Sequence, residues 1–396
     1  MSAIEAYASS VTVEDLDRDP YPVYARLREE APVCFLPAVG LWFVTRWADV
    51  ESAATRPDVF SARVDPSPLE RTMGGESILL LDGEPQKRLR AMLDPSLRPR
   101  VVEATTPDLV EPLVAELLDG LEARGEAELM SEYFEPISVV GLGRVLGLGH
   151  LDGDTLRRWF HGLAEGATNF EDDPAKWAVA DATAAEIDAE LASVFERLDA
   201  EPDGSTIATM LAYAEGTLTE RVATILPTLK VILLGGMQEP GHAAGSTLVG
   251  LLESGQVDAV RDDPTLVRDA VEEGLRWVSP IGTQTRRALV DAELGGTAVP
   301  TGANLGLLVS SANRDEEVWG PTADEYDLFR PKRTHAAFGF GTHYCSGHHF
   351  SRVQMRIAIG RLLERLPGLG LDADRPPLWS GWEFRAPRSL HVRWDA

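Results

Sequence analysis

The most constraining feature of this sequence is a glycine-rich decapeptide with one cysteine, residues 338–347 (FGFGTHYCSG). The residues that follow, 350–366, have the pattern of an amphipathic helix. Such a turn presents Cys345 at a helix N-terminus, where main-chain N–H groups and the positive end of the helix dipole stabilise a thiolate. Gly339 and Gly341 permit backbone geometry, and a close approach to a flat group, that a Cβ would obstruct. A lone cysteine is more often an inert, buried side chain, but this context favours a thiolate site.

Composition and length indicate one large domain over residues 1–396, because no linker, repeat or low-complexity tract divides the chain. A hydrophobic content of 44% with nine tryptophans can form a sizeable core, which excludes global disorder. The two cysteines, Cys34 and Cys345, and an N-terminus without signal-peptide character predict a soluble, cytoplasmic protein. Nothing approaches the roughly 18 apolar residues that a membrane span requires.

The charge balance disfavours nucleic acid and anionic membranes as partners, because 37 basic residues face 63 acidic ones. The distribution of the basic residues is uneven. They cluster at Lys87, Arg88, Arg90, Arg98 and Arg100, and again at Arg352 and Arg356. These clusters suit an acidic electron donor, although a solvated charged face is an equally good interpretation of each residue.

The predicted fold is mainly α with small β-sheets. A helix that begins at a proline is expected near residues 19–28, and strands are expected at 33–35 and 42–44. Beyond about residue 84 the apolar period is helical for most of two hundred residues. The longest helix begins with a capping box at Thr217 and Glu220, could run to Leu252, and would be about 50 Å long. Short β segments are expected from 282 to 308.

The decapeptide resembles, position for position, the cysteine loop of the cytochrome P450 haem-thiolate monooxygenases, and the resemblance covers nearly the whole chain. It implies a haem b held between the long helix and this loop, with Cys345 as the axial ligand of the iron. Phe338 would pack beside the sulfur, His343 would lie near a haem propionate, and Gly339 and Gly347 would complete the loop. The resemblance also implies that the protein uses O2 and electrons from a donor protein.

Further motifs match the family. Glu273 and Arg276 lie three residues apart on one helix face, a spacing that by itself indicates only a surface ion pair. The resemblance implies that the pair is buried, is joined by Arg330 and stabilises the haem-binding core. It also implies that Arg286 and Arg90 bind the haem propionates. Gln86 stands where the family usually has a histidine, and its amide can still donate a hydrogen bond.

The long helix departs from the family pattern at residues 234–241 (LGGMQEPG). Gly235 and Gly236 fit the loosened segment that admits dioxygen, and Pro240 cannot donate a helical hydrogen bond. Gln238 stands at the position of the family's acid and Glu239 at the position of its threonine. Because glutamine cannot deliver a proton, Glu239 becomes the proton donor, with a pKa raised by burial. Gly236, Gln238 and Glu239 are the predicted catalytic set, and Glu239 could also promote cleavage of hydrogen peroxide. A solvent-facing carboxylate is the alternative.

The same segment resembles bacterial aromatic O-demethylases that act on guaiacol, as do residues 279–286 and 381–385. The implied substrate is a small methoxylated aromatic, converted to a catechol and formaldehyde in aromatic catabolism. The predicted pocket residues, each of which could instead be ordinary core, are Phe170, Val231, Leu234, Gly235, Ile281, Thr285 and Phe384. The electron donor is either a flavin and iron-sulfur reductase or a ferredoxin. Two alternatives are a hydroxylase of another small molecule and a haem sensor without turnover.

Overall fold

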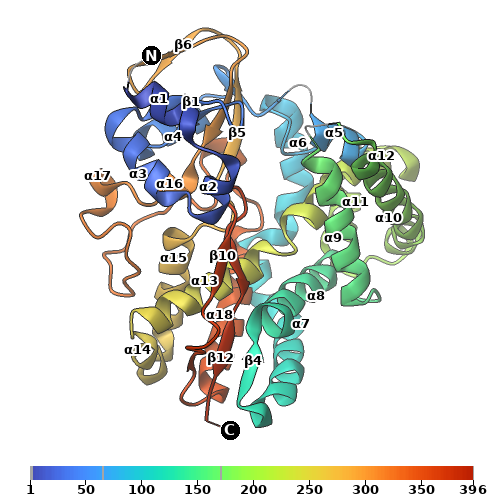
Figure 1. Ribbon diagram of the computed structural model, residues 1–396. Helices are drawn as coiled ribbons and strands as arrows, with labels where there is room; N and C mark the ends of the chain where they lie inside the picture. The colour runs from blue at the N-terminus through green and yellow to red at the C-terminus, as the bar shows by residue number, and fades with distance from the viewer. Residues whose placement is uncertain (1–2, 65–66, 170–171, 396) are drawn as a thin grey trace.

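The computed structural model describes residues 3–64, 67–169 and 172–395, and its described part is mainly helical with four small sheets (Figure 1). The predicted fold class is confirmed. None of the helices in the described residues is long and apolar enough to cross a membrane.

The helices and strands follow one another along the whole chain. The α-helices are α1 (Ala3–Ser10), α2 (Val13–Arg18), α3 (Tyr21–Glu30), α4 (Trp47–Ala54), α5 (Pro68–Met73), α6 (Gly83–Leu93), α7 (Pro99–Leu121), α8 (Glu135–Leu146), α9 (Gly153–Ala167), α10 (Pro174–Ala200), α11 (Thr206–Tyr213), α12 (Leu218–Gly235), α13 (Glu239–Glu253), α14 (Val257–Asp262), α15 (Val267–Trp277), α16 (Val309–Ala312), α17 (Glu316–Trp319) and α18 (His348–Arg365). Short helical turns are η1 (Asp94–Leu97), η2 (Glu122–Arg124), η3 (Met130–Phe134), η4 (Pro264–Leu266) and η5 (Gly341–His343). The strands are β1 (Val33–Leu36), β2 (Leu41–Val44), β3 (Phe60–Ser61), β4 (Glu126–Glu128), β5 (Gln284–Ala288), β6 (Ala292–Leu294), β7 (Thr297–Val299), β8 (Asn304–Leu307), β9 (Gly370–Leu371), β10 (Leu378–Ser380), β11 (Ala386–Ser389) and β12 (His391–Arg393).

The largest sheet joins the two regions in which strands were expected. Its order is β1-β2-β8-β5-β3, and only the β2–β8 pair is parallel. Phe43 on β2 and Leu305 on β8 are both buried but point to opposite faces of the sheet, so each face is covered by its own apolar cluster. The sheet packs at the upper left of Figure 1, away from the green helices α8 to α11. It brings β5 to the edge of the helical core.

The predicted long helix is in fact two helices. It begins at the expected capping box, where Thr217 and Glu220 bond reciprocally, but α12 ends at Gly235 and α13 begins at Glu239. The interruption has a local cause, because Pro240 has no N–H to donate and two glycines precede it. Residues 236–238 therefore form a break in the middle of the molecule, between α12 and α13 (Figure 1).

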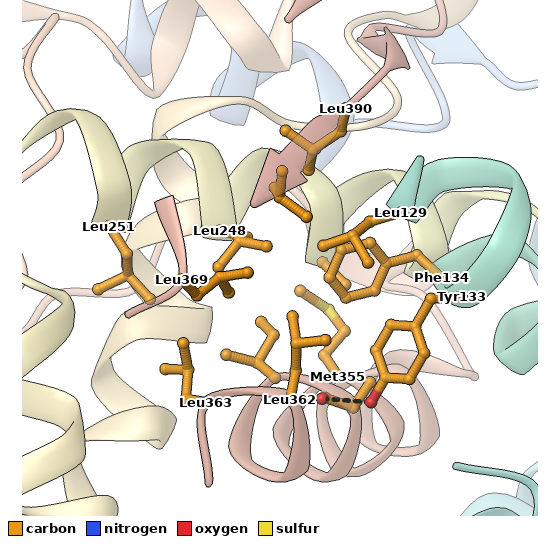
Figure 2. Packing of buried hydrophobic residues seen from close by; sticks show 14 of the residues in the cluster. Leu129, Tyr133, Phe134, Leu248, Leu251, Met355, Leu362, Leu363, Leu369 and Leu390 are labelled. Atoms are coloured by element: carbon orange, nitrogen blue, oxygen red, sulfur yellow. Dashed lines mark hydrogen bonds between the residues drawn. The ribbon is translucent and has the colours of Figure 1, made fainter. Parts of the chain in front are cut away.

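The largest hydrophobic cluster surrounds α13 and α18. Figure 2 shows Leu248 and Leu251 facing Met355 and Leu362, with Tyr133 at one side. The buried hydroxyl of Tyr133 donates to the main-chain oxygen of Ala358 at 2.8 Å, so its burial leaves no unsatisfied donor. This core packs α13 against α18, and so fixes the position of the α12–α13 break relative to the start of α18. It therefore positions the site described next.

Candidate active site

The cysteine loop is fixed by main-chain geometry. The N–H of Cys345 donates to the oxygen of Phe338 at 2.9 Å, and Gly347 caps α18 immediately afterwards. Gly339 has a φ of +75°, and a Cβ there would also collide with the side chain of Gln284. Ser346 donates to Asp94 at 2.8 Å, which ties the loop to the end of α6. The sequence-based expectation of a cysteine presented at a helix N-terminus is met.

The thiol of Cys345 opens into an internal cavity. The residue lines that cavity and is exposed there. Burial raises the pKa of the Cys345 thiol, whereas the N–H of Gly347 and the charge of Arg90 oppose that shift. The cavity is lined mostly by apolar side chains, among them Ile78, Leu79, Leu93, Leu142, Val145, Leu146, Val231, Ile232, Pro240, Leu275, Pro280, Ile281, Phe338 and Phe350.

The α12–α13 break forms another part of the cavity wall. Gly235 and Gly236 line it, and a Cβ added at Gly235 would meet no atom within 4 Å. Glu239 also lines it, is only 7% exposed, and its Oε2 has no hydrogen-bond partner in the described part of the chain. Burial raises the pKa of Glu239 to about 7, opposed by main-chain N–H groups of Glu239 and Gln238. This carboxyl can therefore carry a proton near neutral pH.

Comparison with known proteins identifies the family. The cytochrome P450 family model matches residues 258–369. A steroid C26-monooxygenase of Mycolicibacterium smegmatis is 30% identical over 374 residues, which is 93% of this chain and 91% of the relative. The chain belongs to the cytochrome P450 family. Cytochrome P450 107B1 of Saccharopolyspora erythraea is 29% identical over 386 residues, covering 93% of this chain and 92% of the relative.

Solved cytochrome P450 structures share the whole fold. The cytochrome P450 CREJ, in complex with (4-ethylphenyl) dihydrogen phosphate, superposes with a TM-score of 0.84. Its sequence identity is 26%, and the match covers 96% of this chain and 98% of that chain. The protein is thus a cytochrome P450 monooxygenase that uses haem b, O2 and electrons from a redox partner.

The residues around the cavity fit a haem with two carboxylates. Arg286 on β5 is buried, its Nη1 donates to the oxygen of Thr285, and its Nη2 has no partner among the described residues. Burial lowers the pKa of Arg286, and the charge of Asp82 only partly opposes that shift. A propionate is the anion that the family's cofactor would bring, so the orphaned guanidinium supports the predicted contact.

The other predicted propionate contacts lie nearby but already have protein partners. Arg90 donates from Nη1 to the oxygen of Tyr344 at 2.6 Å and from Nε to Asp94 at 2.9 Å. His343 pairs through Nε2 with Asp82 at 3.0 Å. Gln86 is buried and donates to the oxygen of Thr342 at 3.0 Å. Gln86, Arg90 and His343 line the cavity, and the propionate roles of Arg90 and His343 stay predictions.

The cavity lining includes only some of the predicted substrate-binding residues, whose roles stay predictions. Val231, Gly235 and Ile281 line the cavity, whereas Leu234, Thr285 and Phe384 are not among its described lining residues. Thr285 is exposed on its strand, and Leu234 packs toward the neighbouring core because it lies on another face of α12. Phe384 pairs with Ile281 through a backbone bridge, and the residue is 44% exposed. Phe170 lies outside the described residues.

Several residues that line the cavity were not predicted from the sequence, because no local pattern distinguishes them. Ile78 and Leu79 lie in a turn before α6, and Leu142, Val145 and Leu146 lie on α8, with apolar patterns like those of any core residues. Gln238 was expected in the catalytic set, but it is not among the described lining residues. Its Nε2 donates instead to Glu135 at 3.4 Å, because the break turns this side chain toward α8.

Glu273, Arg276 and Arg330 form the buried cluster that the family resemblance implies. Arg276 donates to both oxygens of Glu273 at 2.8 and 2.6 Å, and Arg330 donates to the same carboxylate at 3.1 Å. Arg276 also donates to the main-chain oxygens of Asn313 and Ala323. The side chain of Asn313 in turn accepts from the N–H of Ala336, just before the cysteine loop. The cluster therefore ties α15 to the segment that leads to Cys345.

A second charged cluster, which sequence analysis missed, lies beside the loop. Glu272 accepts from Nε and Nη2 of Arg352 at 2.6 and 3.0 Å and pairs with His335 at 3.2 Å. The guanidinium of Arg352 lies 4.3 Å from the ring centre of Phe338. The sequence-based assignment of Arg352 to an exposed basic patch is corrected, because this side chain is already paired and only 18% exposed. Lys87, Arg88, Arg98 and Arg100 are exposed and stay candidates for a donor face.

Proposed function

We propose that this cytochrome P450 oxidatively O-demethylates a small, neutral methoxylated aromatic of the guaiacol type. The observation that carries the proposal is the composition of one cavity. It holds the thiol of Cys345, a mostly apolar wall and the buried carboxyl of Glu239 at the α12–α13 break. An apolar wall favours a neutral ring over a charged substrate, because burying an unpaired charge is costly. The sequence of the break resembles that of aromatic O-demethylases, and this likeness supports a substrate with a methoxy group.

The haem, when bound at Cys345, supplies the activation of O2. The chain's own residues supply orientation, exclusion of water and a proton. Gly235 leaves open space beside the break, and Val231 and Ile281 pack against an apolar ring. Glu239 lines the cavity, its Oε2 has no hydrogen-bond partner among the described residues, and burial raises its pKa to about 7, which makes it the proposed proton donor.

The overall reaction is balanced. An aryl methyl ether, O2, two electrons and two protons give an aryl hemiacetal and water. The hemiacetal then loses formaldehyde and leaves the phenol, which is a catechol when the substrate is guaiacol. The electrons come from the redox partner, either a flavin and iron-sulfur reductase or a ferredoxin. The exposed cations Lys87, Arg88, Arg98 and Arg100 are the proposed contact region for that partner, because the protein's net charge of −26 otherwise repels acidic proteins.

The substrate proposal is tested by optical titration of the holoenzyme with guaiacol, other methoxyphenols and methoxybenzoates. Guaiacol is expected to convert the haem from low to high spin with saturation, and turnover is expected to release one formaldehyde for each catechol formed. Catechol, which lacks the methyl group, is the matched control and should yield no formaldehyde. If no methoxylated aromatic shifts the Soret band, the proposed substrate class is wrong.

A second candidate is hydroxylation of a larger apolar molecule. The steroid C26-monooxygenase at 30% identity favours it, since the lining of this cavity is equally compatible with an aliphatic surface. A sterol in the same titration distinguishes the two, because only one class should give a saturable spin shift. In either case, the reduced carbon monoxide complex should show the red-shifted Soret band of thiolate ligation, and Cys345→Ser should abolish it.

A further inference from the structure

The carboxyl of Glu239 is almost completely buried. Only 7% of the residue is exposed, and its Oε2 has no hydrogen-bond partner in the described part of the chain. A carboxyl that releases a proton in every catalytic cycle must regain one from water. Polar side chains that lie between the α12–α13 break and the surface are therefore candidates for supplying this proton.

One such row starts at the residue next to Glu239. Gln238 Nε2 donates to Oε1 of Glu135 at 3.4 Å, and Arg157 Nε donates to the same oxygen at 2.7 Å. Arg157 Nη1 donates onward to Asp154 at 3.0 Å. Side-chain exposure rises from 21% at Glu135 to 31% at Arg157 and 90% at Asp154. The row thus runs from the break to the surface, with Glu135 as its innermost carboxylate.

Close packing explains why Glu135 reaches the break. Gly241, in the first turn of α13, lies so near the main chain of Phe134 that an added Cβ would be 2.9 Å from its oxygen. Glu135 is the first residue of α8 and follows Phe134 directly. The first turns of α8 and α13 are therefore adjacent. As a result, the carboxylate of Glu135 on α8 reaches the side-chain amide of Gln238.

We propose that Glu135 is the proton-entry residue that recharges Glu239. This inference rests on the proposed function, in which Glu239 is the proton donor. The O–H bond of protonated Glu135 breaks, a water in the break carries the proton, and an O–H bond forms on Glu239. Water at the surface then returns a proton to Glu135, so no oxidant or reductant is consumed. Gln238 and Arg157 are positioning residues, because an amide and a guanidinium donate hydrogen bonds but do not release protons here.

Proton exchange can be measured without turnover. In the haem-containing protein, the infrared carboxyl band of protonated Glu239 is assigned as the band that Glu239→Gln removes. After mixing into D2O, Glu135→Gln is expected to slow the deuterium shift of this band by roughly tenfold or more. Glu186→Gln is the matched control, because Glu186 also pairs with an arginine of α9, namely Arg158 at 2.6 Å. It should leave the exchange rate unchanged.

The outcomes separate the two proposals. If Glu239→Gln removes no band, the proton-donor role of Glu239 fails whatever Glu135 does. If the band is assigned but exchanges at the wild-type rate in Glu135→Gln, the entry role of Glu135 is overturned. Steady-state kinetics give a second readout, because Glu135→Gln should lower kcat and raise the solvent isotope effect at unchanged KM. Glu135→Asp, which keeps a carboxyl, should restore the exchange rate; failure of that rescue also counts against the proposal.

Discussion

At the residue scale, the chemistry of this cytochrome P450 depends on how burial changes a side chain. Cys345 and Glu239 lie on the same cavity, yet each needs a different environment. The thiol needs donors and cations around it, which Gly347 and Arg90 provide, and the carboxyl needs a lack of them. The unpaired Oε2 of Glu239 is consistent with that lack. The side chain of Glu239, whose Oε2 lacks a hydrogen-bond partner among the described residues, is thus the proposed proton donor of the site.

The first prediction concerns the pH dependence of Glu239. Burial raises its pKa from 4.5 to about 7, so the carboxyl is protonated below pH 7 and loses its proton above it. Turnover supported by the redox partner should therefore decline as pH rises through about 7. Glu239→Gln should be slower by roughly 100-fold or more and should lack this decline. The check is kcat against pH for both proteins, with NADH and with hydrogen peroxide. Unchanged rates in both assays would show that Glu239 has no catalytic role.

At the element scale, glycines set the distances between helices. Gly241 brings α13 against the main chain of η3, and Gly274 on α15 lies against Thr247 of α13. These close approaches fix the start of α13, and with it the carboxyl of Glu239. The sequence showed these glycines, but it could not show which neighbours they touch, since Phe134 is 107 residues from Gly241 and Thr247 is 27 residues from Gly274.

The second prediction tests this close packing by stability. Gly241→Ala should destabilise the folded protein by about 1–3 kcal/mol, because the new methyl group meets a main-chain carbonyl that cannot rotate away. Gly120→Ala in α7 is the matched control, because its added Cβ meets no atom within 4 Å. The control should be stabilised by up to about 1 kcal/mol through helix propensity. Thermal unfolding of the haem-containing proteins measures both, and equal melting temperatures for the two variants would contradict the packing argument.

At the scale of the whole molecule, buried ion pairs join segments that are far apart in sequence. Glu273, Arg276 and Arg330 join α15 to the segment after α17, and Glu272 joins α15 to α18 through Arg352. Both clusters lie around the cysteine loop. The first was expected from its likeness to the family. The second was not, because Glu272 and Arg352 are 80 residues apart and no local pattern links them.

The third prediction is a pH-dependent contribution to stability from Glu272. Burial alone would raise its pKa, but hydrogen bonds from His335 and Arg352 prevail and lower it from 4.5 to about 2. The carboxylate therefore stabilises the fold above pH 4.5, and this contribution is lost as pH falls toward 2. Because the side chain is 37% exposed, screening reduces the effect to about 1 kcal/mol.

The test compares Glu272→Gln with the wild type across this range. The variant should melt at a lower temperature near neutral pH, and the difference should shrink as the pH approaches about 2. Glu111→Gln breaks an exposed pair with Arg361 and should change the melting temperature less. A difference for Glu272→Gln that persists at the lowest pH would mean that ionisation is not its cause.

The sequence by itself determined the cysteine loop, the helical class and the family, because a turn's glycines, a helix start and a ligand spacing are all local. It also located the departure at Gln238 and Glu239. Only the tertiary structure decided that the long helix breaks there, that Gln238 contacts Glu135, and which of the predicted pocket residues line the cavity. The burial of a side chain and its hydrogen-bond partners depend on segments that packing brings together. No local sequence pattern specifies those contacts.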